Sequence, residues 1–257
     1  MGSTNLRYDW KRFWCPRSGR NLLDQEGYLL DPEIERSQYW KLDAVAFEAI
    51  SSKPCLLLLG EPGIGKTHAM GTLHKVTAAQ LPAGEELLLI DFRFDRDLKG
   101  DFFEDAKFKD WLEGKNTLHL FLDSLDECPD VDAASRILGK LRRGPIENLR
   151  LRIACRTAEV PPILEPQLHE LWGKDGEGNS LVGVYELAPL RKKDVELAAR
   201  DEGLDVDAFL SEVARRGAVA LAIKPRHTWL PRAPVSHQGR AAGYAVGNLR
   251  IGMSHSL

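Results

Sequence analysis

Short apolar runs alternate with amphipathic stretches through the middle of the chain. Between about residues 45 and 190, near-continuous apolar runs predict strands at 55–59, 87–92, 118–122, 150–155 and 181–187. Apolar residues at helical spacing predict helices between these strands, near 66–80, 104–112, 131–142 and 163–172. Strands that are apolar on both sides are typical of a parallel sheet buried between helices. We therefore predict an α/β fold in three layers, with helices on both faces of a parallel sheet.

The pattern changes on either side of this core. Residues 1–44 are irregular and rich in aromatic and basic residues, and we expect them to form a strap that packs on the core. A segment that contacts a partner or an adenine is the alternative. Residues 191–224 turn helical, and the apolar repeat from Val206 to Val213 stands behind Asp205, a good N-cap. This stretch predicts the beginning of a small helical lid.

Residues 225–257 differ in composition from the rest of the chain. They hold four Arg and no Asp, Glu or Lys, and no apolar periodicity continues beyond Ile223. We expect a disordered or frameshifted tail that replaces the rest of a helical domain. A basic tail that binds an acidic partner is the alternative.

Composition limits the classes of function. The 257 residues suffice for one α/β domain with additions at both ends. A formal net charge of −3 gives no reason to expect a nucleic-acid or membrane partner, and the longest apolar run, five residues, is too short to cross a bilayer. The N-terminus lacks the apolar stretch of a secretory signal, and the four cysteines have no zinc-type spacing, so we expect a cytoplasmic protein.

The octapeptide GEPGIGKT at residues 60–67 carries the strongest chemical signal. It fits G-x-x-x-x-G-K-[ST] and stands between a predicted strand and a predicted helix, where backbone N–H groups and a helix N-terminus can hold phosphate. Lys66 supplies a positive charge to the β- and γ-phosphates, and Thr67 offers its hydroxyl to Mg²⁺. A purely structural Gly-rich turn is the alternative. The predicted nucleotide-binding residues are Gly60, Glu61, Pro62, Gly63, Ile64, Gly65, Lys66, Thr67 and His68.

A second signal follows the predicted strand at 118–122. Asp123 ends this strand and can hold Mg²⁺ directly or through water. Glu127 is the candidate that orients and deprotonates the attacking water, and Asp126 either shares that work or shapes the outer shell of the metal. Because ligands of open α/β sheets bind at the carboxyl ends of strands, we expect this loop to meet the phosphate loop at one crevice. A solvated acidic turn is the alternative.

A third signal is the strand at 150–155, which is followed by Arg156. The planar guanidinium of arginine can donate two hydrogen bonds to adjacent phosphate oxygens, so Arg156 is a candidate sensor of the γ-phosphate. The alternative is an arginine paired with a neighbouring carboxylate.

Together these segments resemble the NACHT-type members of the STAND class of P-loop NTPases. The resemblance rests on GEPGIGKT, FLDSLDE at 121–127, the strand that ends in CRT at 155–157, and YELAPLRKKDV at 185–195. Residues 123–127 match the D-[GAS]-x-D-E motif of the family, and Arg156 corresponds to its strand-terminal arginine. The resemblance covers about residues 45–224.

The resemblance implies a specific fold and function. It implies a five-stranded parallel sheet in the order 5-1-4-3-2, bound ATP or ADP with Mg²⁺, ATP preferred over GTP, and a nucleotide-controlled switch. Similar bacterial proteins act in antiviral and other conflict systems. We therefore expect slow Mg²⁺-dependent ATP hydrolysis and nucleotide-dependent self-association. Two alternatives stay open: a scaffold that binds nucleotide without turnover, and an AAA+ remodelling ATPase in which Arg142 or Arg143 serves a neighbouring subunit.

Overall fold

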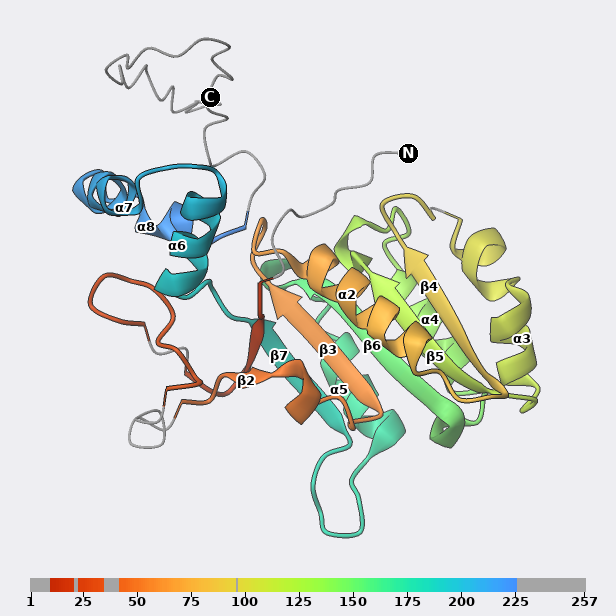
Figure 1. Cartoon of the computed structure of the whole chain (residues 1–257). Helices are drawn as coiled ribbons and strands as arrows, with labels where there is room; N and C mark the ends of the chain where they lie inside the picture. The colour runs from red at the N-terminus through yellow and green to blue at the C-terminus, as the bar shows by residue number, and fades with distance from the viewer. Residues whose placement is uncertain (1–9, 21–22, 35–41, 96, 226–257) are drawn as a thin grey trace.

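A computed structural model describes the chain at residues 10–20, 23–34, 42–95 and 97–225. A single sheet between layers of helices forms its centre, and a group of short helices follows toward the C-terminus (Figure 1). The expected disordered or frameshifted tail at 225–257 lies outside the described residues, apart from Pro225.

Parallel strands form the body of the sheet. Their bounds are β3 Cys55–Gly60, β4 Glu85–Asp91, β5 Thr117–Asp123, β6 Leu149–Arg156 and β7 Val182–Leu187. They lie in the spatial order β7-β3-β6-β5-β4, which is the 5-1-4-3-2 order that the family resemblance implies. The predicted fold class is confirmed, because this strand order and the strand–loop–helix unit at residues 55–79 define the three-layer fold of P-loop NTPases.

The described part of the sheet has seven strands, two more than the predicted five. The strand β1 Phe13–Pro16 pairs antiparallel with β7, and β2 Val45–Ala46 pairs antiparallel with β1. Residues 13–16 are thus regular, in contrast to the irregular strap expected over residues 1–44. The Trp14 side chain is 1% exposed, which shows that this aromatic segment belongs to the core. A four-residue strand that ends in proline has no alternation that sequence analysis can detect.

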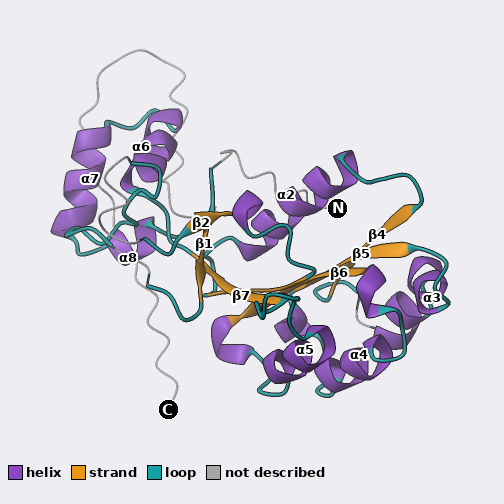
Figure 2. Ribbon diagram, turned by 90° about the horizontal axis from the view of Figure 1, so that it is seen from below, coloured by secondary structure: helices purple, strands orange, loops and turns teal. Residues whose placement is uncertain are grey.

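Helices cover both faces of the sheet, as predicted. Helix α2 Lys66–Ala79 lies on one face, and α3 Ala106–Leu112, α4 Ala133–Leu141 and α5 Leu164–Trp172 lie on the other (Figure 2). Leu56 and Leu58 of β3 pack with α2, whereas Leu57 and Leu59 belong to the core beneath α3–α5. Shorter helical turns are η1 Phe47–Ala49, the π-helix η2 Leu98–Phe103, η3 Leu125–Glu127, η4 Ile146–Asn148 and η5 Thr157–Glu159.

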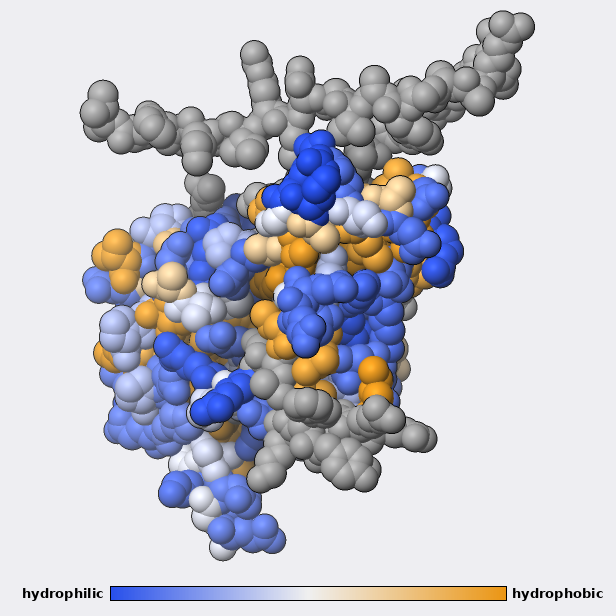
Figure 3. All heavy atoms as spheres, turned by 90° about the vertical axis from the view of Figure 1, so that its left-hand side faces the viewer, coloured by the Kyte–Doolittle hydropathy of each residue, from blue (hydrophilic) through white to orange (hydrophobic). Residues whose placement is uncertain are grey.

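The helices α6 Lys192–Asp201, α7 Val206–Arg215 and α8 Val219–Ala222 follow the sheet. As predicted, Asp205 caps α7, because its side chain accepts a hydrogen bond from the backbone N–H of Ala208 at 2.9 Å. The side of the molecule that carries these helices shows hydrophobic patches among hydrophilic residues (Figure 3). Within the described ranges, no helix combines the length and the hydropathy that crossing a bilayer requires.

Candidate functional site

The phosphate-loop motif folds as a strand, a tight loop and a helix. β3 is the fully buried strand between β6 and β7, and α2 begins at Lys66. Gly63 and Gly65 have φ values of 77° and 96°, in the left-handed region that residues with a Cβ rarely adopt. A Cβ at Gly60 would stand 2.8 Å from the Ile64 side chain. The loop conformation therefore requires glycine at each of these positions.

Lys66 lies over its own loop. Its Nζ donates hydrogen bonds to the carbonyl oxygens of Gly60 at 2.6 Å and of Glu61 at 3.2 Å. Burial is the main cause that lowers the pKa of Lys66, and the nearby Asp126 carboxylate opposes this effect. A positive charge is thus held at the start of α2, where the helix dipole also favours an anion.

The two predicted metal-binding residues lie near each other. Asp123 ends β5 and is 3% exposed, and the neighbouring Thr67 side chain acts to lower the pKa of its carboxyl group. Burial, and next the neighbouring charge of Asp91, raise the pKa of Asp123 to about 6. The buried Oδ1 of Asp123 has no hydrogen-bond partner among the described residues. A buried carboxylate oxygen without a partner, beside a threonine hydroxyl, fits the hard oxygen ligands that Mg²⁺ prefers.

The acidic loop turns sharply after Asp123. Ser124 has a φ of 57°, in the left-handed region, and its carbonyl accepts a hydrogen bond from the backbone N–H of Glu127 at 2.8 Å. This turn directs Asp126 toward β6, where its Oδ1 accepts from the backbone N–H of Arg156 at 2.9 Å. A small residue at position 124 suits this conformation, because the left-handed region crowds a large side chain.

Arg156 binds both remaining acids of the motif. Its Nε lies 3.0 Å from Oδ2 of Asp126, and its Nη2 lies 3.0 Å from Oε1 of Glu127. Its Nη1 donates to Glu159 at 3.1 Å, and this bond is the main cause that raises the pKa of Arg156. This is the carboxylate-paired arrangement, the alternative in the sequence analysis. The Asp126 side chain is 2% exposed and that of Glu127 is 40% exposed, so Glu127 is the acid that solvent reaches.

The sequence signals converge at one edge of the sheet. Gly60 pairs with Arg156 across β3 and β6, and the charges of Asp123, Asp126 and Arg156 all act on Lys66. The side chains of the other candidates do not take part in these charge contacts. The exposed Glu61 forms an ion pair with Lys224, and Arg142 forms one with Glu170 of α5. Pro62 is exposed beside Glu61, and His68 lies partly buried in the first turn of α2.

Sequence analysis missed Arg12. Its guanidinium donates hydrogen bonds to the carbonyl oxygens of Ile64 at 3.0 Å and Ala188 at 2.7 Å, and burial lowers its pKa to about 10. A Cβ at Gly65 would stand 2.9 Å from the Pro225 side chain and 3.2 Å from Arg12. Residues from both flanks of the core therefore contact the phosphate loop. A basic residue in an aromatic segment was the only sequence signal.

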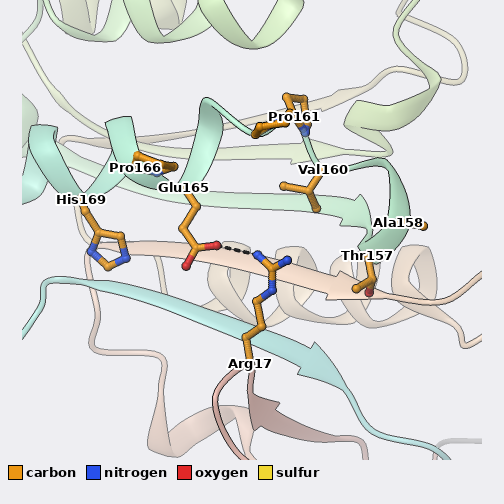
Figure 4. A pocket seen from close by; sticks show the side chains of 9 residues that line it. Arg17, Thr157, Ala158, Val160, Pro161, Glu165, Pro166 and His169 are labelled. Atoms are coloured by element: carbon orange, nitrogen blue, oxygen red, sulfur yellow. Dashed lines mark hydrogen bonds and ion pairs between the residues drawn. The ribbon is translucent and has the colours of Figure 1, made fainter.

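A cavity of about 570 Å³ lies apart from the phosphate loop, along α5 and the end of β6 (Figure 4). Arg17 points across it to Glu165, with 2.6 Å between Nη1 and Oε2. None of the predicted site residues lines the cavity. Its lining residues are Arg17, Thr157, Ala158, Val160, Pro161, Pro162, Glu165, Pro166 and His169.

Among the described side chains, no group of three or more His, Cys, Asp or Glu is arranged to hold a metal ion. A magnesium site of the NTPase type does not need one, because Mg²⁺ there is bound by one or two carboxylates together with phosphate oxygens and water. The Thr67–Asp123 pair is a set of this smaller kind.

Strand order, phosphate loop and acidic strand end together define the class: the chain has a P-loop NTPase fold. No protein-family model and no curated protein matches its sequence. Solved structures that it resembles include domain III of the replication initiation protein DnaA from Thermotoga maritima, at 14% identity and a TM-score of 0.40, over 60% of this chain and 63% of that one.

Two further solved structures are similar to the same extent. AMPPCP-bound DnaA from Aquifex aeolicus matches at 12% identity and a TM-score of 0.43, over 68% of this chain and 57% of that chain. Cdc6p from Pyrobaculum aerophilum matches at 16% identity and a TM-score of 0.41, over 66% of this chain and 51% of that chain. The match thus spans less than two thirds of each of these solved chains.

Proposed function

We propose that this protein binds ATP or ADP together with Mg²⁺ and hydrolyses ATP slowly. The observation that carries the proposal is the buried Asp123 carboxylate near Thr67, whose Oδ1 has no hydrogen-bond partner among the described residues. The end of the phosphate loop and the acidic strand end thus lie close together, and the charge of Asp123 also acts on Lys66. A site with these parts can hold a polyphosphate and its cation at once.

Each residue has a role that follows from its place. The loop N–H groups and Lys66 hold the phosphates, and Thr67 and Asp123 hold the metal ion. When bound, Mg²⁺ neutralises charge on the β- and γ-phosphates. Glu127 is exposed at the edge of the site and accepts the proton of the attacking water. Arg156 fixes the orientation of Glu127.

We propose further that nucleotide controls a switch, as in the NACHT and STAND proteins that the motifs resemble. Support comes from the contacts between the lid segment and the phosphate loop. Lys224 pairs with Glu61 at 2.5 Å, and Pro225 lies against Gly65. A change in the loop on nucleotide binding would act on both contacts. Nucleotide-dependent self-association and a role in antiviral defence follow from the same resemblance, whereas the cytoplasmic location is proposed from the four free cysteines. The net charge of −3 supports a function without nucleic acid.

A scaffold that binds nucleotide without turnover is the second candidate. The observation that favours it is the ion pairing of Arg156 with three carboxylates, which engages Asp126 and Glu127 together. In a scaffold these bonds persist with nucleotide bound. In an ATPase, Glu127 must also reach a water molecule.

Titration calorimetry with ATP, with and without Mg²⁺, tests the proposal. We expect the wild-type chain to bind Mg²⁺–ATP. Lys66→Ala should weaken binding about tenfold or more, since a charge-assisted hydrogen bond contributes ~1.5–3 kcal/mol. Lys75→Ala, an exposed lysine on the same helix, is the matched control and should bind like wild type. Absence of binding by the wild-type chain, or equal binding by Lys66→Ala, would contradict the proposal. Single-turnover hydrolysis of labelled ATP then separates the ATPase from the scaffold.

A further inference from the structure

A second arginine, Arg93, lies at the candidate metal site, in the turn after a strand that none of the motifs includes. Arg93 follows β4, and the last residue of β4, Asp91, is paired with Asp123 across the sheet. The Arg93 Nη2 forms an ion pair with Oδ2 of Asp91 and lies 4.0 Å from Oδ2 of Asp123. The guanidinium thus faces the carboxylate that we assign to Mg²⁺.

Arg93 is held in this place by its own turn. Its Nε donates to Oδ1 of Asp91 at 2.8 Å, which makes the contact bidentate, and its backbone N–H donates to the same oxygen at 3.2 Å. The backbone N–H of Asp91 in turn donates to Oδ2 of Asp95 at 2.7 Å. A planar fork bound at two points loses little further freedom when it binds a ligand. Arg93 is therefore pre-oriented toward the site.

The position of Arg93 completes the charge pattern across the sheet. In spatial order, the carboxyl ends of the strands carry Lys66 after β3, Arg156 on β6, Asp123 on β5 and Arg93 after β4. Cations thus flank Asp123 on both sides. A triphosphate bound beside Asp123 would also face the negative charge of Asp91, at the end of β4. A positive charge there offsets the repulsion between these anions, and Arg93 supplies it.

Arg93 also differs from Arg156 in how many of its N–H groups are free to bind a ligand. The two side chains are similarly exposed, at 33% and 35%. Arg156 binds three carboxylates, whereas Arg93 binds Asp91 and only approaches Asp123 at 4.0 Å, which is too long for a hydrogen bond. The N–H groups of Arg93 that face Asp123 can therefore donate hydrogen bonds to phosphate oxygens.

We infer that Arg93 contacts the terminal phosphate of a bound triphosphate and that Asp91 positions it for this contact. The inference rests on the proposed function, since it adds a residue to the same nucleotide site. An arginine beside the carboxylate that would hold Mg²⁺ stands where the terminal phosphate, which ADP lacks, would be bound together with the metal ion. Arg93 is then a residue that distinguishes ATP from ADP and belongs to the same chain as the phosphate loop.

Calorimetry with Mg²⁺–ATP and Mg²⁺–ADP on the full chain tests this inference without measuring turnover. We expect Arg93→Ala to weaken ATP binding about tenfold, the size of one charge-assisted contact, and to change ADP binding by no more than about twofold. Arg93→Gln, which keeps most of the side-chain volume, should show the same loss of ATP preference. Asp91→Asn should lose part of the ATP preference, because Arg93 is kept but its ion pair with residue 91 is lost. Arg215→Ala is the matched control, since Arg215 forms the same bidentate contact with Glu212 on α7, and it should bind both nucleotides like wild type.

The outcomes separate this inference from the proposed function. If wild-type protein binds neither nucleotide, the proposed function and this inference both fail. A second outcome is that wild type binds both nucleotides and Lys66→Ala binds neither. If the ratio of ATP to ADP affinity in Arg93→Gln then equals that of wild type, the nucleotide site is supported and the assignment of Arg93 is overturned. An equal loss of ATP and ADP affinity in both Arg93 variants also overturns it, because the arginine would then only neutralise Asp91 and Asp123.

Discussion

The guanidinium of Arg12 donates a hydrogen bond to the backbone carbonyl of Ile64, at 3.0 Å, inside the phosphate loop. The same guanidinium donates to the carbonyl of Ala188, just after β7, at 2.7 Å. One side chain from the N-terminal segment thus joins the phosphate loop to the segment that leads into helices α6–α8. Because both acceptors are backbone atoms, the contact depends on the loop conformation and not on the side chains of the loop.

Arg12→Ala should therefore affect both the fold and nucleotide affinity. We expect a loss of about 1.5–3 kcal/mol in the free energy of unfolding, because two buried carbonyls lose a charged donor. We also expect weaker ATP binding in proportion to the mobility that the loop gains. Urea unfolding and calorimetry measure the two effects, with the exposed Arg20→Ala as control. An unchanged unfolding midpoint would mean that Arg12 does not hold the loop.

Two glycines near the loop should respond to alanine in opposite directions. At Gly65, φ is 96° and a Cβ would meet Pro225 at 2.9 Å, so Gly65→Ala should destabilise the protein by about 1–3 kcal/mol and weaken ATP binding. Gly71 lies inside α2, with nothing within 4 Å of its Cβ position, so Gly71→Ala should stabilise by about 0.5–1 kcal/mol. Thermal unfolding of both variants checks the prediction. A loss of stability at Gly71 would contradict its placement in the open interior of α2.

Glu127→Gln should keep ATP binding and stop hydrolysis. The amide keeps the shape of the side chain but cannot take a proton, and a general base contributes about 10²–10⁴-fold to rate. Glu159→Gln is the matched control, because Glu159 also pairs with Arg156, at 3.1 Å. Single-turnover hydrolysis measures the rate in each variant. Equal losses in the two variants would point to the orientation of Arg156 as the cause and remove Glu127 from the role of base.

Arg191 should be among the most sensitive positions for stability. It is 5% exposed, binds Asp194 through two contacts at 2.8 Å, and also reaches Asp31 at 3.1 Å and Glu33 at 2.9 Å. Arg191→Ala leaves the buried Asp194 without its cation, so we expect a loss of about 3–5 kcal/mol.

Chemical denaturation measures this loss. The comparison is Arg200→Ala, an exposed arginine of α6, the helix that Arg191 directly precedes. A loss below about 1 kcal/mol in the free energy of unfolding would contradict this prediction, because the ion pairs of Arg191 would then stabilise no more than exposed surface pairs do.

The core of the fold follows from local sequence, because each central strand is an uninterrupted apolar run. β3 contains Cys55-Leu56-Leu57-Leu58-Leu59, all fully buried, and such a run has few other stable places than the middle of a sheet. β1 contains only Phe13–Pro16, and it becomes a strand because β7 offers it a partner. A pairing between segments about 170 residues apart leaves no local pattern to detect.

The candidate site also contains residues that motifs predict and residues that only the fold places there. Lys66, Thr67 and Asp123 occur in motifs with fixed spacing, so their neighbourhood was predictable from sequence. Arg93 stands at no motif position, and its place beside Asp123 follows from the pairing of Asp91 with Asp123, which requires the spatial order of the strands. Arg12 binds backbone carbonyls, which no residue type reveals.

The antiparallel pairing of β1 with β7 sets a limit on where this protein can be shortened. A variant trimmed to begin at residue 45 would retain all of the phosphate loop and still lose the ladder from Trp14 to Pro16. The open N–H and C=O groups along β7 would then be a template for strands from other molecules, as unprotected sheet borders are. Poor solubility of such a trimmed variant would reflect this uncovered sheet edge and would say nothing about its ability to bind nucleotide.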